Sequence, residues 1–150
     1  IVVGAALGGK GVSTWLGFIF GLVVLLSGDA SVFLAIDPLG TVITVLLKGS
    51  LAGLVGGFAF QMLKKVNTYF AVIISAILVP LTNTGIFLLG CRLFFFETIK
   101  EWAVGMGFEN AFTYMIVGLV GVNFIFELVI NIILSPSIVG IVKTLSKKKI

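Results

Sequence analysis

The sequence predicts an all-α membrane protein, and three observations carry that prediction. The 150 residues are 59% hydrophobic and only 11% charged, whereas soluble domains average about 25% charged residues. The mean hydropathy is +1.27. Several windows of about eighteen residues carry at most one charge, which is long enough for a helix to cross about 30 Å of hydrocarbon. The apolar runs lack the alternation of a membrane β-barrel, so helices are predicted rather than strands.

The charged, glycine-rich and proline-rich stretches divide the chain into one transmembrane helical domain, residues 1–150, with four full spans and one partial span. The partial span covers residues 1–9, and the full spans cover 12–28, 39–63, 67–96 and 111–142. The connections fall at 8–11, 27–38, 64–67 and 97–110. None of these connections is long enough to hold a soluble domain.

Basic residues gather on one side of these spans, and this distribution predicts the orientation. That side carries Lys10, Lys64, Lys65, Lys143, Lys147, Lys148 and Lys149, whereas the opposite connections carry Asp29, Asp37, Glu97, Glu101 and Glu109 with a single Lys100. Cytoplasmic loops are enriched in Lys and Arg, so we expect a cytoplasmic C-terminus and a partial span that descends toward the cytoplasm. The net charge of +4 is therefore a topology signal, and no nucleic-acid partner is expected.

Histidine is absent from the sequence and cysteine occurs once, which limits the enzyme chemistry that this chain can carry. Cys91 is the only cysteine and there is no histidine, which excludes an intrachain disulfide, a zinc site of the usual ligands and a Ser-His-Asp triad within this chain. No glycine-rich phosphate loop of the G-x-x-x-x-G-K-[ST] type occurs. Glu127 is the only acid within the spans. We therefore expect no enzyme, no metal and no cofactor.

Small residues recur at a spacing of four within two of the spans. Gly17 and Gly21 lie in the first full span, and Gly49, Gly53 and Gly57 lie in the second. Such a spacing stacks the glycines along one helix face and lets another helix approach closely. Two roles stay open: packing between helices of this chain, or a groove for a separate membrane partner. The second role makes these glycines the candidate partner-packing surface.

Polar residues within the spans are the candidate solute-binding set, because an ionisable group in the membrane costs about 3 kcal/mol or more and normally faces protein or water. Depth counting at 1.5 Å per residue places Lys48 and Asn83 near mid-membrane on neighbouring spans. The last span repeats polar residues every four positions, on one face. The set comprises Lys48, Thr82, Asn83, Thr84, Arg92, Asn123, Glu127 and Asn131.

Each of these residues also has a purely structural interpretation. Lys48 and Glu127 can form a buried ion pair, and Asn123 and Asn131 can hydrogen-bond neighbouring helices. Arg92 can reach the outer headgroups. In the functional interpretation, the same residues line a cavity open to the outer face, with Lys48 or Arg92 as the counter-charge for an anionic solute.

The stretch VPLTNTG, residues 79–85, predicts a bend in the third full span. Pro80 has no N–H to donate and clashes with the preceding turn, so the helix is expected to kink or loosen there. Thr82, Asn83, Thr84 and Gly85 would then offer side chains and exposed backbone to a cavity. The alternative is a kink without a ligand.

Four stretches together resemble the substrate-binding S components of energy-coupling-factor transporters. These are GAALGGKGVSTWLGFIFGLVVLLSG, IDPLGTVITVLLKGSLAGLVGGFAFQMLKK, VPLTNTGIFLLGCRLFF and VGVNFIFELVINIILSPSIVGIVK. The resemblance implies a bundle of six helices with both termini cytoplasmic, in a prokaryotic cell membrane. Residues 1–9 then match the end of the second helix, the full spans match the third to sixth, and the first helix is expected to be missing.

The resemblance also implies a function and partners. This chain would capture a small water-soluble vitamin or related micronutrient from outside, while a transmembrane coupling subunit and two ATPase subunits drive uptake. Phe33, Trp102 and Phe108 would be lids over the solute, or else ordinary interfacial anchors. A pantothenate-like anion is the candidate solute. The alternatives are a structural subunit of a larger membrane complex and a small stand-alone channel or exporter.

Overall fold

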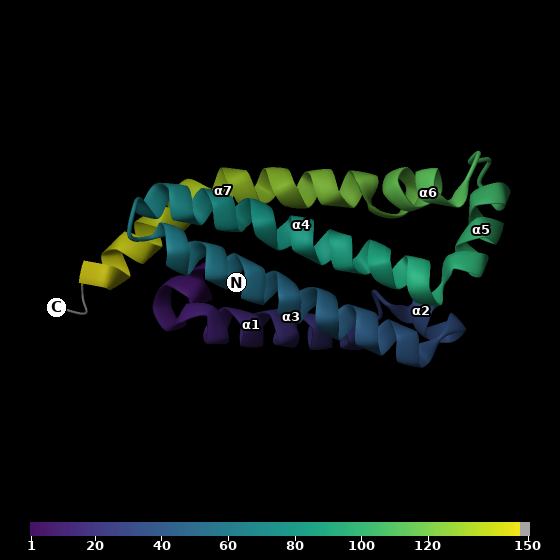
Figure 1. Ribbon diagram of the computed structural model, residues 1–150, viewed down its shortest axis with the longest axis horizontal. Coiled ribbons are helices and arrows are strands. Elements are labelled where there is room, and N and C mark those ends of the chain that lie inside the picture. The colour runs from purple at the N-terminus through teal and green to yellow at the C-terminus, as the bar shows by residue number, and fades with distance from the viewer. Residues whose placement is uncertain (148–150) are drawn as a thin grey trace.

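The computed structural model describes residues 1–147, and every described element is helical. Four long helices lie side by side along the long axis of the molecule (Figure 1). They are α1 (Val2–Ser27), α3 (Pro38–Leu63), α4 (Thr68–Phe94) and α7 (Val122–Lys147). The shorter elements are α2 (Ser31–Ile36), α5 (Phe96–Gly105), α6 (Ala111–Thr113) and the π-helical segment η1 (Tyr114–Gly121).

The four long helices coincide with the predicted full spans to within a few residues at most of their ends. In the described chain, 4 helical stretches are long and apolar enough to cross a membrane: Val2–Ser27, Pro38–Leu63, Thr68–Phe94 and Ala111–Thr144. They are compatible with a multi-pass membrane protein. The long connections at 27–38 and 97–110 are not simple loops, because they contain α2 and α5. Helix α5 lies across one end of the bundle (Figure 1).

Two of the long helices begin at short polar residues that cap them. The Asp37 carboxylate accepts the N–H of Gly40 at 2.9 Å, and Pro38 occupies the first turn of α3, where its missing N–H is harmless. The Asn67 side chain accepts the N–H of Tyr69 at 2.8 Å at the start of α4. These caps fix the residues at which α3 and α4 begin.

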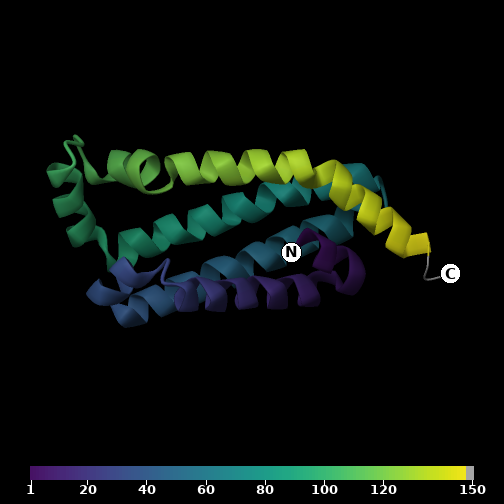
Figure 2. The same ribbon diagram turned by 180° about the vertical axis from the view of Figure 1, so that it is seen from behind.

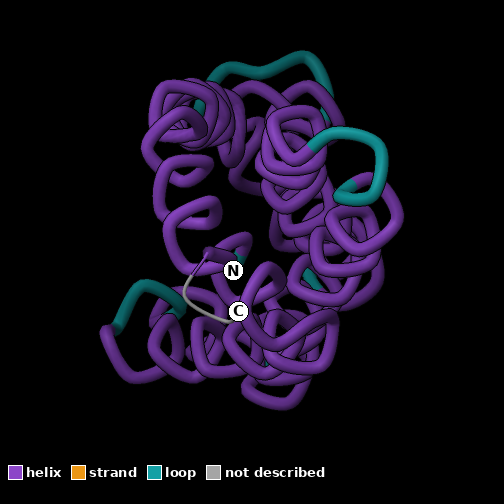
Figure 3. Tube along the Cα trace, turned by 90° about the vertical axis from the view of Figure 1, so that its left-hand side faces the viewer, coloured by secondary structure: helices purple, strands orange, loops and turns teal. Residues whose placement is uncertain are grey.

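A sharp break at Gly9 divides α1 into two parts. Gly9 has φ 77 and ψ −169, a conformation that glycine adopts readily and other residues avoid. The short N-terminal part doubles back beside the rest of the bundle (Figure 2), and its Ala5 carbonyl accepts the Gln61 amide N–H at 2.9 Å. Viewed end-on, the N-terminus lies among the other helices (Figure 3). The partial span predicted at residues 1–9 is thus a short helical piece within the bundle.

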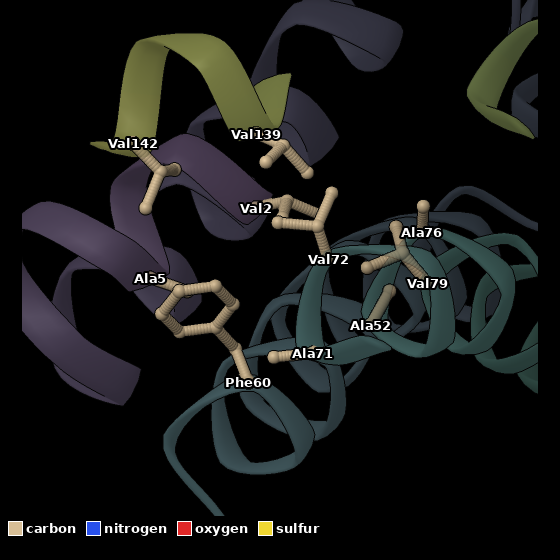
Figure 4. Packing of buried hydrophobic residues seen from close by; sticks show 10 residues of the cluster. All are labelled: Val2, Ala5, Ala52, Phe60, Ala71, Val72, Ala76, Val79, Val139 and Val142. Carbon is tan, nitrogen blue, oxygen red and sulfur yellow. The ribbon is translucent and has the colours of Figure 1, made fainter. Parts of the chain in front are cut away.

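The main apolar core lies at the end of the bundle where this N-terminal piece is held. It joins all four long helices (Figure 4): Val2, Ala5, Ala52, Phe60, Ala71, Val72, Ala76, Val79, Val139 and Val142. Because lipid is as apolar as these side chains, they stabilise the bundle through close van der Waals packing between helices. Alanine and valine dominate, so the helices approach closely here.

The charged residues separate to opposite ends of the bundle, as the sequence predicts. Lys10, Lys64, Lys65 and Lys143 lie at what we call the basic end, beside the α3–α4 turn, whereas Asp29, Asp37, Glu97, Glu101 and Glu109 lie at the acidic end, beside α2 and α5. Lys148 and Lys149 lie outside the described residues, as does the side chain of Lys147. The cytoplasmic location of the basic end remains a prediction.

The bend predicted at Pro80 does not interrupt the helix. Helix α4 continues from Thr68 to Phe94 with Pro80 inside it. Proline removes one hydrogen bond, to the Ala76 carbonyl, but Val79 and Pro80 are both buried, and packing holds the helix together there. The visible bend is in α7, toward its C-terminal end (Figure 2), and that helix contains Pro136.

Candidate functional site

A cavity of about 760 Å³ lies between the long helices, on the acidic side of the core. Its volume is within the range of small-molecule sites, about 300 to 1,000 Å³. Residues from both halves of the chain line it: Phe20, Val24, Asp29, Ala30, Phe33, Thr41, Thr44, Val45, Lys48, Asn83, Thr84, Phe87, Phe95, Leu119, Val120, Asn123, Phe126, Glu127, Ile130 and Asn131. The sequence-predicted residues Lys48, Asn83, Thr84, Asn123, Glu127 and Asn131 are therefore brought together.

Helix α3 supplies a polar face to this cavity. Thr41, Thr44 and Lys48 follow one another at helical spacing and all line it. The Thr41 hydroxyl donates to the Asp37 carbonyl at 2.7 Å, whereas the Thr44 hydroxyl is buried and has no hydrogen-bond partner among the described residues. The Lys48 Nζ lies 5.0 Å from the centre of the Phe87 ring, a cation–π distance. Thr44 and Lys48 thus keep hydrogen-bonding capacity for a further group.

Helix α4 contributes two of the three polar residues of the VPLTNTG stretch. Asn83 and Thr84 line the cavity, whereas Thr82 does not. The Asn83 Oδ1 atom is buried without a hydrogen-bond partner in the described part of the chain. An unsatisfied buried carbonyl costs about 1 to 3 kcal/mol. The unsatisfied side chain of Asn83 therefore indicates a position where a bound solute or water donates a hydrogen bond.

Helix α7 closes the opposite side with the predicted ladder of Asn123, Glu127 and Asn131. The Asn131 amide N–H donates to the Glu127 backbone carbonyl at 2.8 Å, within the same helix. Hydrogen bonds from the two asparagines to other helices, the structural alternative, are not formed in the described residues. The predicted ion pair between Lys48 and Glu127 is also not formed: within the described chain, the ion pair at 4.0 Å or less joins Lys100 and Glu97.

Arg92 does not line the cavity, and its role in solute binding stays a prediction. It is exposed, and its guanidinium carbon lies 4.0 Å from the centre of the Phe96 ring. Lys100 approaches the same ring at 4.9 Å. Arg92 follows Asn83 by nine positions, which turns its side chain to a different helix face from the one that lines the cavity.

An aromatic cluster covers the cavity at the acidic end. The Phe33 ring of α2 lies 5.6 Å from that of Phe87, 5.0 Å from Phe95 and 5.8 Å from Trp102. Phe33, Phe87 and Phe95 line the cavity. Of the predicted lids, Phe33 thus borders the cavity and Trp102 supports it from α5, whereas Phe108 packs against Tyr114 at 5.2 Å instead.

The five patterned glycines are packed between α1 and α3, so their assignment as a surface for a separate partner is wrong. A Cβ on Gly17 would overlap the carbonyl oxygen of Gly49, and a Cβ on Gly53 would overlap that of Ser13. Gly21 and Gly57 meet α3 and α1 in the same way. The Ser13 hydroxyl donates to the Gly53 carbonyl at 2.6 Å across this contact. The intrachain alternative is the one observed.

Two residues that line the cavity, Thr44 and Phe87, are not among the sequence-predicted site residues, although their spacing could have identified them. Thr44 precedes Lys48 by four residues, so the face that carries the lysine also carries the threonine, and this spacing was available from the sequence. Phe87 follows Asn83 by four residues in the same way.

A second, smaller cavity of about 230 Å³ lies toward the basic end. Four residues line both this cavity and the larger one: Phe20, Asn83, Glu127 and Asn131.

The charged, polar and aromatic groups that line the cavity can contact a small molecule from several sides. Among the described residues, no group of three or more His, Cys, Asp or Glu side chains could hold a metal ion. Compared with known proteins, the chain matches no family model, no curated protein and no solved structure.

Proposed function

We propose that this chain is the solute-capture subunit of a membrane importer of the energy-coupling-factor type. The observation that carries the proposal is the cavity between α1, α3, α4 and α7, in which Thr44 and Asn83 keep buried polar atoms without partners in the described chain. Such atoms are normally satisfied by protein, water or a ligand. The resemblance of four sequence stretches to S components gives the same class of function.

In this proposal the chain spans a prokaryotic cell membrane several times. The basic end faces the cytoplasm and the acidic end faces outside, because positive residues favour the cytoplasmic side. A solute then enters past Phe33 and rests between Lys48, Asn83 and the polar face of α7. A separate transmembrane coupling subunit and two ATPases supply the energy, and this chain performs no catalysis of its own.

The solute is a small, water-soluble, vitamin-like molecule that bears a carboxylate. Lys48 is the only Lys or Arg that lines either described cavity, and its ammonium makes no ion pair within the described chain. The ring carbons of Phe33 and Phe87 offer an apolar wall beside it. Pantothenate is the first probe to test.

The proposal is tested by thermal unfolding of the purified protein in detergent against a panel of water-soluble vitamins. A ligand at 100 times its Kd adds about 2.7 kcal/mol to the free energy of unfolding, so a true ligand raises Tm in a concentration-dependent way. Asn83→Leu is the matched control, because it removes one lining group. If no member of the panel raises Tm, a structural subunit is favoured. Solute flux through liposomes that contain this chain alone would favour a channel or exporter.

A further inference from the structure

The cavity holds two opposite charges on different helices. Lys48 projects from α3 and Glu127 from α7, and both line the cavity. Within the described residues neither side chain makes an ion pair, although Lys100 and Glu97 do so at 2.9 Å elsewhere in the chain. Helix α7 packs chiefly against α4 rather than against α3. The acid and the base thus face the same space from different sides.

Lys48 and Glu127 are half-buried, so a bound group that pairs with both charges at once satisfies them best. An ionised group removed from water costs several kcal/mol unless it is paired and hydrogen-bonded. A purely anionic solute would pair with Lys48 but approach Glu127 with like charge. A purely cationic solute would leave Lys48 unpaired. A solute that carries both charges satisfies the two side chains together.

The neutral groups around the two charges fit the same kind of solute. Thr44 and Asn83 each present a buried oxygen with no hydrogen-bond partner in the described chain. The amide oxygen of Asn83 can accept from an ammonium, and the Thr44 hydroxyl can donate to a carboxylate. Asp29 also lines the cavity, but it is exposed and its Oδ2 accepts from the Ser27 hydroxyl at 2.6 Å. Its charge is therefore already hydrogen-bonded at the cavity's edge.

We infer that the captured solute is a zwitterion, whose anionic group pairs with Lys48 while its ammonium pairs with Glu127. The apolar part of the solute lies against the Phe33 and Phe87 rings. This inference rests on the proposed capture function and narrows its substrate class. Selectivity then comes from charge pattern: a solute that lacks either charge leaves Lys48 or Glu127, both half-buried, without a partner, which costs more than the lost contact alone.

Matched probes test the inference in the purified full chain. Phenylalanine is zwitterionic, N-acetylphenylalanine is anionic, phenylalaninamide is cationic and N-acetylphenylalaninamide is uncharged, all on one aromatic skeleton. The dipeptide Phe-Phe and its three blocked forms repeat the series with a wider charge separation. Pantothenate represents the anions of the vitamin panel. Tm shifts followed by calorimetric titration give a Kd for each probe.

We expect a zwitterionic probe to bind at least about tenfold more tightly than each of its blocked forms. Lys48→Met and Glu127→Gln should each weaken that zwitterion by about tenfold or more. Glu127→Gln keeps the shape of the side chain and removes only its charge. It therefore tests the charge alone, whereas Lys48→Met also disturbs packing. Arg92→Met, outside the cavity, is the matched control and should leave the Kd unchanged.

The possible outcomes separate this inference from the capture function. If pantothenate or N-acetylphenylalanine binds best, and Glu127→Gln leaves that affinity equal or higher, the solute is an anion: the inference fails and capture stands. Tightest binding by a cationic or uncharged probe likewise overturns the inference alone. If no probe and no vitamin of any charge class binds, the capture function fails and the inference fails with it.

Discussion

The contact between α1 and α3 and the space between α3 and α7 show two opposite ways of arranging membrane-type helices. Along the first, glycines let two backbones approach so closely that a Cβ on Gly49 would overlap the Gly17 carbonyl oxygen. Along the second, Lys48 and Glu127 face a cavity of about 760 Å³. One side of α3 is thus closed by packing, and another is held open.

The difference lies in residue size and polarity at helical spacing. Lipid provides no hydrophobic force that drives helices together, so association depends on close packing and hydrogen bonds. Glycine removes the side chains that would separate α1 from α3, and the Ser13 hydroxyl adds a buried hydrogen bond to Gly53. On α7, the large polar side chains of Asn123, Glu127 and Asn131 instead face the cavity. We therefore expect substitutions at the closed contact to change stability, and substitutions at the open side to change binding.

The largest expected effect is loss of stability in Gly49→Ala. The added methyl group meets backbone, which cannot move aside as a flexible side chain can, so α1 and α3 must separate. We expect the free energy of unfolding to fall by about 2 to 3 kcal/mol, measured as a decrease in Tm of the protein in detergent.

Gly85→Ala on α4 is the matched control, because a Cβ there meets nothing within 4 Å. Alanine is a better helix former than glycine by about 1 kcal/mol, so this variant should be as stable as the parent or more so. Equal losses in the two variants would show that the closeness of α1 and α3 is not what stabilises the bundle.

The second effect concerns the open side and is a change in affinity. Asn83→Leu removes a buried oxygen that has no hydrogen-bond partner in the described chain. We expect affinity for the captured solute to fall at least about tenfold, or about 1.4 kcal/mol, while the stability of the unliganded protein stays equal or rises. Thr82→Val, one residue away and outside the cavity, is the control. A variant that unfolds instead would make Asn83 a structural residue.

The third effect is a modest loss of stability in Ser13→Ala. This change deletes the hydrogen bond of 2.6 Å from the Ser13 hydroxyl to the Gly53 carbonyl. Such bonds contribute about 0.5 to 1.5 kcal/mol, so Tm should fall slightly while solute affinity is unchanged. Ser137→Ala, an exposed serine on α7, should have no effect. A change in affinity would link the closed contact to the cavity.

Much of the fold could be predicted from the sequence, because long apolar runs between charged turns determine where membrane-type helices begin and end. Asp37 and Asn67 mark two of these starts. The continuity of α4 through Pro80 could not be predicted, since it depends on burial against α3. The fold-back at Gly9 also depends on tertiary contacts, such as that of Gln61 with the Ala5 carbonyl.

The candidate site could be predicted in part. Depth along a helix can be counted, which predicted that Lys48 and Asn83 lie near one level, and both line the cavity. The face of a helix on which a residue lies can also be counted from its spacing. Thr44 could have been found in this way, because it precedes Lys48 by four residues. The partner of each glycine face could not be predicted, because the same spacing serves contacts within a chain and between chains. The family resemblance and the identity of the solute stay predictions.

Arg92 gives the smallest expected effect and the sharpest test of where the open side ends. Its guanidinium stacks on Phe96, a contact worth about 0.5 to 1 kcal/mol at an exposed site. Arg92→Met keeps an apolar side chain against the ring, so Tm should change by no more than about that amount, and solute affinity should match the parent. Lys48→Met, measured beside it, should lose affinity. If Arg92→Met weakens binding as strongly as Lys48→Met, the arginine must swing from Phe96 toward the solute, and the cavity would then extend to the acidic end of α4.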